Sequence, residues 1–246
     1  MVEKSDFFKD VKIEEVEVSG ELVRFPVRYY DQMRISANFP APIQNVRKLI
    51  PSDKLKPVET KPGKTVVVLI AFEYKHLDNI APYNEFGVFV PVLYKKSDED
   101  QGMLGSYCLH LPVTTERARY GGVAIYGYPK FVADITFEDL GDRVRCRVWA
   151  DGKYIITLDV KKVETATKTS ETYSFTVKDG KILRTLVQTY GLVGTSSIRG
   201  GASYILGDHP ISTELRSLKI GKTALQYSYM PKLQSLLHKP TLSLPM

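Results

Sequence analysis

Long runs of β-branched and aromatic residues, broken by turn residues, dominate the chain and predict a mainly β protein. Three continuous apolar runs cover Lys64 to Tyr74, Phe86 to Tyr94 and Tyr107 to Val113. Runs of this kind are typical of strands that are buried on both faces. We therefore expect these segments to lie in the middle of a large sheet.

Two Asp-Gly pairs predict tight β-hairpins, because this dipeptide favours the two-residue turn that joins antiparallel strands. Asp151-Gly152 joins Arg143–Ala150 to Lys153–Val160, and Asp179-Gly180 joins Glu171–Val177 to Ile182–Thr189. Gly221 predicts a third turn, between strands over Leu215–Ile220 and Thr223–Tyr229.

Helical patterns are scarce. Apolar residues recur at helical spacing between Pro42 and Ile50, and Pro51 would end that helix. A short turn is predicted over Leu233–His238. Many successive strands and few helices predict an α+β but mainly β fold, with a large antiparallel or mixed sheet that is closed or strongly curled. No linker or repeat divides the sequence, so residues 1–246 are expected to form a single domain.

Composition fits an ordinary globular protein, with 43% hydrophobic and 25% charged residues. No apolar run approaches the roughly 20 residues of a membrane span. The charged start, Met1 to Asp6, and the presence of only two cysteines, Cys108 and Cys146, predict a reduced, cytoplasmic protein without a signal peptide.

The formal net charge of +6 raises the question of nucleic-acid binding. The densest basic cluster, Arg143 to Arg147, alternates with apolar residues. At strand spacing its arginines share one face while Val144, Cys146 and Val148 share the other. This pattern indicates a solvated strand face, so neither nucleic acid nor membrane is an expected partner.

The common catalytic motifs are missing from the sequence. The four histidines have no metal-ligand spacing, and no Gly-x-Ser-x-Gly elbow is present. The segment Gly191 to Ser197 lacks the Gly-Lys-Ser/Thr ending of a phosphate loop and is predicted to be a turn between strands. No metal is therefore expected.

The segment Gly121 to Phe131 (GGVAIYGYPKF) carries the candidate chemistry. It places Lys130 after a proline at the end of an apolar, aromatic stretch that we interpret as a strand. Burial favours the neutral form of an amine, and a neutral amine can attack a carbonyl group to form a Schiff base. The alternative is a surface lysine whose stem covers apolar residues.

This segment resembles the lysine motif of the acetoacetate decarboxylase family, Gly-Arg-Glu-x-x-Gly-x-Pro-Lys, with Lys130 on the Schiff-base lysine. Further resemblances follow in order along the chain. They are Arg47–Pro51, which is similar to an early helix of the family, Tyr83–Gly87, which resembles its Tyr-x-Glu-x-Gly segment, and Gly207–Ile211 with Leu215–Ile220, which resemble its closing region.

The resemblance implies a closed mixed barrel or cone with peripheral helices, a central pocket and a homo-oligomer. It implies that Lys130 forms an iminium with a small keto acid and itself accepts the electrons released with CO2, so that no cofactor is required. Glu85 would assist proton transfers, and its alternative role is to cap backbone N–H groups in a turn. Glu73 corresponds to a second family glutamate if the alignment takes a gap.

Three departures from the family pattern concern the site. Phe131 replaces a second lysine, so the activation of Lys130 has to come from burial; Phe131 either excludes water from the amine or points into an unrelated core. Val123-Ala124 replaces the Arg-Glu of the motif. Gln32 stands where the family has an arginine near the substrate carboxylate, and Arg28 and Arg34 lie nearby. Tyr128 is a further auxiliary candidate.

Three functions remain open at this point. The first is a Schiff-base lyase that decarboxylates a keto acid, most simply acetoacetate to acetone and CO2. The second is an aldolase- or dehydratase-like enzyme that acts on another oxo acid through the same lysine. The third is a barrel without catalytic activity, in which Lys130 binds a small ligand as an ionic anchor.

Overall fold

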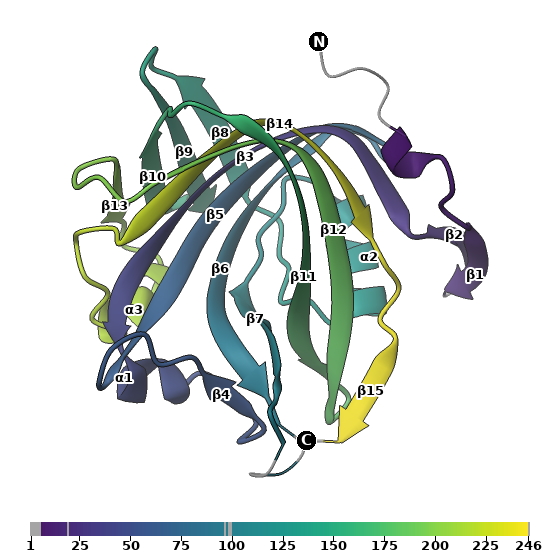
Figure 1. Cartoon of the computed structure of the whole chain (residues 1–246), viewed down its shortest axis with the longest axis horizontal. Coiled ribbons are helices and arrows are strands. Elements are labelled where there is room, and N and C mark those ends of the chain that lie inside the picture. The colour runs from purple at the N-terminus through teal and green to yellow at the C-terminus, as the bar shows by residue number, and fades with distance from the viewer. Residues whose placement is uncertain (1–5, 19, 96, 98–99, 246) are drawn as a thin grey trace.

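Seven long strands close into a barrel in the computed structural model, which describes residues 6–18, 20–95, 97 and 100–245 (Figure 1). The strands are β3 (Val27–Pro42), β5 (Lys64–Leu77), β6 (Tyr83–Tyr94), β7 (Met103–His110), β11 (Ala166–Lys178), β12 (Lys181–Ser196) and β14 (Gln226–Leu237). They follow the order β11-β7-β6-β5-β3-β14-β12, and the pairing of β11 with β12 closes the ring. Because β11 runs parallel to β7 and the other neighbours are antiparallel, the barrel is mixed. The predicted fold class is confirmed.

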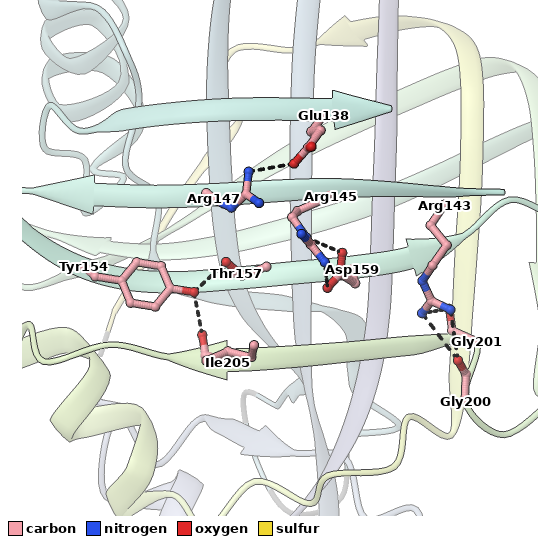
Figure 2. A network of polar contacts seen from close by, with 10 residues as sticks. All are labelled: Glu138, Arg143, Arg145, Arg147, Tyr154, Thr157, Asp159, Gly200, Gly201 and Ile205. Atoms are coloured by element: carbon pink, nitrogen blue, oxygen red, sulfur yellow. Dashed lines mark hydrogen bonds and ion pairs between the residues drawn. The ribbon is translucent and has the colours of Figure 1, made fainter. Parts of the chain in front are cut away.

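A smaller antiparallel sheet packs against the outside of the barrel (Figure 1). Its strands are β8 (Asp134–Asp139), β9 (Arg143–Ala150), β10 (Lys153–Lys161) and β13 (Ala202–Leu206). Val144, Cys146 and Val148 of β9 are buried toward the barrel. The arginines that alternate with them form ion pairs on the other face, where Arg145 pairs with Asp159 and Arg147 with Glu138 (Figure 2). The predicted solvated strand face is confirmed.

Both predicted hairpins are present. Asp151 and Gly152 have φ values of 51° and 70°, and Asp179 and Gly180 have φ values of 50° and 70°. Positive φ at both central positions is the conformation of a type I′ turn, which matches the twist of the strands that it joins. The first hairpin joins β9 to β10, and the second joins β11 to β12.

The remaining elements lie around the barrel. The short strands are β1 (Glu14–Val18) and β2 (Glu21–Phe25), which pair with each other, β4 (Leu55–Pro57), which pairs with β6, and β15 (Leu242–Pro245), which pairs with β12. The helices are a 3-10 turn over Asp6–Phe8, α1 (Ile43–Arg47), α2 (Glu116–Tyr126) and α3 (Pro210–Ser217). The predicted helix before Pro51 is confirmed in α1.

Three local predictions are wrong. The segment Leu215–Ile220 is not a strand, because α3 begins after His209, whose ring nitrogen accepts the Ile211 N–H (3.2 Å), and runs to Ser217. Leu233–His238 is not a turn, because β14 occupies the gap between β3 and β12 and completes the ring. Residues 191–196 are the last part of β12 rather than a turn: Gly191 and Leu192 pair with both β11 and β14, and Gly194 to Ser196 pair with β14.

Two separate cores result from this arrangement. The larger one fills the space between the barrel and the smaller sheet, where Ile35 of β3 and Leu158 of β10 are fully buried. The other lies inside the barrel and is rich in tyrosines, among them Tyr29, Tyr74 and Tyr128. No helix among the described residues is long and apolar enough to cross a membrane. Residues 1–5, on which the prediction about a signal peptide rests, lie outside the described part of the chain.

Candidate active site

Lys130 is positioned by helix α2 and the turn that follows, not by a strand as the sequence predicts. The Thr115 hydroxyl accepts the N–H of Ala118 (3.3 Å) and caps the start of the helix. Gly127 ends it with a φ of 62°, a left-handed conformation that glycine adopts without strain. After Pro129 the chain is extended and bonds to the segment 111–113. The strand prediction is wrong because the buried positions recur at helical spacing, namely Ala118, Gly122 and Tyr126.

The ammonium group of Lys130 points into the barrel and meets the carboxylate of Glu85. The distance from Lys130 Nζ to Glu85 Oε2 is 2.5 Å, and the two side chains are only 7% and 6% exposed. Glu85 lies on β6, opposite Phe72 of β5. Its second oxygen, Oε1, accepts a hydrogen bond from the Tyr74 hydroxyl at 3.1 Å. The structure thus brings together the two residues that the sequence singled out first.

Tyrosine side chains surround this pair. The rings of Tyr83 and Tyr128 lie 5.7 Å and 5.8 Å from Lys130 Nζ. Burial raises the pKa of Tyr74, Tyr83 and Tyr128 well above the ordinary value, and the negative charge of Glu85 raises the pKa of each further. These phenols therefore stay protonated at neutral pH, and Tyr74 donates its proton to the hydrogen bond with Glu85. Tyr128, predicted as an auxiliary residue, belongs to the site.

A glycine in α2 makes room for the lysine side chain. A Cβ atom added to Gly122 would lie 2.4 Å from Cδ and 2.5 Å from Cε of Lys130. Any other residue at this position would have to displace the lysine stem. Gly121 is different, because a Cβ added there would meet no atom within 4 Å.

Two cavities meet at Lys130. The inner cavity, of about 210 Å³, is lined by Lys130, Glu85, Tyr74, Arg34 and Ser235 together with apolar residues of the barrel. The outer cavity, of about 520 Å³, lies between α2, the β1–β2 hairpin and the start of β6. Lys130, Tyr29, Tyr128 and Leu237 line both cavities. The side chain of Lys130 therefore lies at the border between the two cavities.

Arg34 is the functional candidate that sequence reasoning left unassigned. Its Nε donates to Oε1 of Gln32 (2.9 Å), and its Nη2 donates to the Ser235 hydroxyl (2.6 Å). Gln32 is fully buried and also donates to Ser235. Among the described residues no carboxylate forms an ion pair with Arg34. Burial lowers the pKa of its guanidinium, while nearby groups, Tyr74 and Glu85 among them, raise it, and an arginine stays charged at neutral pH.

An irregularity in β3 explains why alternation did not reveal Arg34. Tyr29 and Arg34 line the same inner cavity although an odd number of positions separates them. The pairing of β3 with β5 shifts register between Tyr29 and Asp31 and again between Asp31 and Gln32. A bulge of this kind moves all later side chains to the other face. Arg28, on the other side of the bulge, pairs with Asp78 instead.

Two predicted residues lie apart from the lysine. Glu73 is flanked by Phe72 and Tyr74, which line the inner cavity, so alternation turns its side chain to the opposite face, where it pairs with Lys75 (3.1 Å). Phe131 stacks on the ring of His209 and packs against the larger core, and it lines neither cavity. In the part of the chain that is described, no three His, Cys, Asp or Glu side chains are grouped as a metal site requires.

The family model for acetoacetate decarboxylase matches residues 17–243 of this chain. None of the curated proteins matches it in sequence.

Solved structures share the fold at low identity. An acetoacetate decarboxylase from Legionella pneumophila has 16% identity and a TM-score of 0.62, with 89% of this chain and 88% of that chain covered. The enduracididine biosynthesis enzyme MppR, complexed with pyruvate, has 12% identity and a TM-score of 0.64, with 89% and 91% covered. An acetoacetate decarboxylase-like enzyme from Sphingomonas wittichii has 14% identity and a TM-score of 0.60, with 93% and 97% covered.

Proposed function

The chain belongs to the acetoacetate decarboxylase family, and we propose that it is a lyase that decarboxylates a 3-oxo acid, in the simplest case acetoacetate, through a Schiff base on Lys130. The observation that carries this proposal is the buried contact between Lys130 and Glu85 on the wall of the inner cavity. A lysine held there meets a base and has little water around it.

Glu85 prepares the nucleophile. A charged ammonium has no lone pair, so it has to lose a proton before it attacks a carbonyl carbon. Glu85 Oε2 lies within hydrogen-bonding distance of Lys130 Nζ and accepts that proton. The Tyr74 hydroxyl holds the other oxygen and thereby fixes the orientation of the carboxyl group. The amine adds to the ketone, and the carbinolamine loses water to give an iminium.

The iminium then supports the loss of CO2. The bond between the carboxylate carbon and the adjacent carbon breaks, and its electron pair moves toward the iminium nitrogen to form an enamine. The proton that Glu85 took from the ammonium has by then left with the water lost from the carbinolamine. Glu85 therefore takes up a proton from solvent and delivers it to the enamine carbon, which restores an iminium. Water hydrolyses this iminium, releases the ketone and regenerates the amine.

Arg34 supplies the positive charge that the sequence shows to be missing at Gln32. Its guanidinium lines the inner cavity with Lys130 and Glu85, and no acidic residue in the described structure neutralises it. A carboxylate is the natural partner of a guanidinium in a cavity that excludes water. Held on Arg34, the substrate would present its carbonyl carbon to Lys130. Gln32 and Ser235 orient the arginine through their hydrogen bonds.

A second reaction would use the same Schiff base. A 2-oxo acid such as pyruvate would also form an iminium with Lys130, and loss of a proton from the next carbon would give an enamine able to attack an aldehyde. The related MppR has been solved with pyruvate bound, which supports this alternative. Product analysis separates the two reactions, because the first releases CO2 and the second forms a carbon–carbon bond.

Borohydride trapping tests the proposal. The protein is incubated with acetoacetate or pyruvate, reduced, and digested, and the adduct is located by peptide mass. We expect the adduct on Lys130 and its loss in Lys130→Arg, because the guanidinium stays charged and is no nucleophile. Lys162→Arg is the matched control, since Lys162 forms an ion pair with Asp139 on the surface. An adduct on another lysine, or none with any keto acid, would leave binding without catalysis as the function.

A further inference from the structure

We infer that the substrate of this protein is a 3-oxo acid with a large apolar substituent on its carbonyl carbon, an alkyl chain or an aromatic ring rather than the methyl group of acetoacetate. The inference rests on the proposed Schiff base at Lys130. The inference goes beyond the proposed Schiff base because it assigns a role to the outer cavity.

The two cavities differ in size. The inner one, of about 210 Å³, is below the range of about 300–1,000 Å³ that is typical of sites for drug-sized ligands, and the outer one, of about 520 Å³, is within it. A four-carbon acid bound at Lys130 needs only the inner cavity and its border. The outer cavity would then stay without an occupant, although Lys130 forms part of its wall.

The two cavities also differ in charge. Arg34, in the inner one, has no ion-pair partner among the described residues. The charged groups on the outer wall are already paired within the protein, for example Arg24 with Glu15 (2.8 Å) and Asp78 with Arg28 (2.6 Å). Glu116, also on the outer wall, pairs with Arg119. A substrate carboxylate is therefore attracted inward, to Arg34.

Apolar side chains form much of the outer wall. Val23 and Val27 contribute from one side, and Ile125 and Leu237 from others. Leu22 of the β1–β2 hairpin and Tyr120 of α2 also line this cavity, although they are 65% and 44% exposed to solvent. Exposed apolar residues beside an apolar cavity are a common sign of a binding site.

The chemistry of a 3-oxo acid matches this arrangement. Its carbonyl carbon carries two arms, one that ends in the carboxylate and one that carries the substituent. With the carbonyl carbon at Lys130 and the carboxylate at Arg34, the second arm is directed toward the outer cavity. Each methylene buried there should raise kcat/KM about three- to fourfold, until the cavity is filled.

Two positions in α2, Gly121 and Val123, give a sharp test. Gly121 lines the outer cavity and has open space beside it, so Gly121→Phe would fill part of that cavity. Val123→Phe places the same ring on an exposed position of the same helix that lines neither cavity, and it serves as the matched control. The substrates are acetoacetate, 3-oxohexanoate, 3-oxooctanoate and benzoylacetate, each corrected for spontaneous decarboxylation with Lys130→Arg.

We expect kcat/KM to rise at least tenfold from acetoacetate to 3-oxooctanoate. Gly121→Phe should lower the ratio of kcat/KM for 3-oxooctanoate to kcat/KM for acetoacetate at least tenfold. Val123→Phe should preserve this ratio. The parent protein could form a trapped adduct with every acid and yet have its highest kcat/KM with acetoacetate. This result would overturn the inference and leave the Schiff-base function intact. A preference for long acids that Gly121→Phe leaves in place would also overturn the assignment of the outer cavity. Absence of trapping with any acid would overturn the proposed function itself.

Discussion

Ion pairs occur in two very different regions of this protein. On the smaller sheet, Arg145 pairs with Asp159 at 2.8 Å and Arg147 with Glu138 at 2.7 Å, on the face turned away from the barrel (Figure 2). Asp159 is buried, and the more exposed pair is Arg147 with Glu138. Inside the barrel, Lys130 pairs with Glu85 at 2.5 Å. The Arg147 and Glu138 side chains are 39% and 45% exposed, whereas those of Lys130 and Glu85 are almost completely buried.

The comparison shows that similar geometry has different consequences in water and in a cavity. Exposed pairs contribute roughly 0–1 kcal/mol, because water solvates the separated charges nearly as well. A buried pair has lost that solvation, and an apolar pair of similar size would often be equally stable or more stable there. Stability alone is therefore a weak reason for Lys130 and Glu85 to lie inside the barrel, and chemistry is a stronger one. Five experiments test this distinction and the site around the buried pair.

Removal of the carboxylate from the buried pair should have the largest effect. Glu85→Gln keeps the size and most hydrogen bonds of the side chain but cannot accept the proton of Lys130. We expect turnover to fall about 10²- to 10⁴-fold, as for the loss of a general base. Initial rates and the rate of borohydride trapping measure the effect, and Glu138→Gln on the surface is the control. In the structure the Glu85 carboxylate contacts Lys130 and Tyr74 rather than capping a turn, so turnover at the parent rate would leave Glu85 only the role of pairing with the buried lysine.

The addition of a single methyl group beside Lys130 should have the second-largest effect on turnover. Gly122→Ala favours the helix, because alanine is the better helix former, but its Cβ would overlap the Lys130 stem. Displacement of the amine by about 1 Å should lower kcat about 10²-fold while the thermal midpoint holds or rises. Melting curves and steady-state kinetics on the same preparation check both parts. A rate equal to that of the parent would show that the lysine adopts another path.

Arg34→Met should impair binding of the carboxylate more than the chemical step. Loss of charged hydrogen bonds to the substrate should lower kcat/KM about tenfold to a hundredfold, mainly through KM. Arg34→Lys should recover part of the loss, since lysine keeps the charge but not the planar fork. Arg28→Met, which breaks the pair with Asp78 on the outer wall and changes no residue of the inner cavity, is the control, with acetoacetate as the substrate. Equal effects of Arg28→Met and Arg34→Met on KM would contradict the role of Arg34.

Phe131→Ala separates burial of the lysine from packing of the core. Because Phe131 stacks on His209 and lines neither cavity, we expect the pH dependence of Lys130 trapping to stay unchanged. The free energy of unfolding should fall by about 1–3 kcal/mol, less than for a fully buried phenylalanine. Trapping across a pH series and denaturant unfolding give the two numbers. A midpoint shifted to higher pH would show that Phe131 shields the amine after all.

The surface pair should give the smallest effect. A double-mutant cycle of Arg147→Ala and Glu138→Ala should yield a coupling energy of about 0.2–1 kcal/mol, which decreases at high salt. Unfolding by urea at two salt concentrations measures it. A coupling well above this range would mean that the exposed network stabilises the sheet as a unit, and the contrast with the buried pair would weaken.

The sequence by itself determined those features that depend on local chemistry. The Asp-Gly pairs set both hairpin turns, because a positive φ at two successive residues is a property of the dipeptide. Alternation along Arg143–Ala150 determined which side chains of β9 face the barrel. The motif around Lys130 and the Tyr83–Gly87 segment identified the lysine and the glutamate, which the fold then brings together from different parts of the chain.

Other features were decided only by the tertiary structure. The irregular pairing around Asp31 turns Arg34 into the cavity, and nothing in the local sequence marks the two compensating shifts between β3 and β5. β14 is a strand because it closes the ring between β3 and β12. The turn after α2 is placed by its hydrogen bonds to the segment 111–113 and by the interior of the barrel rather than by propensity. Closure of a barrel satisfies hydrogen bonds between residues far apart in sequence, so its register and its interior follow from the whole ring rather than from any one strand.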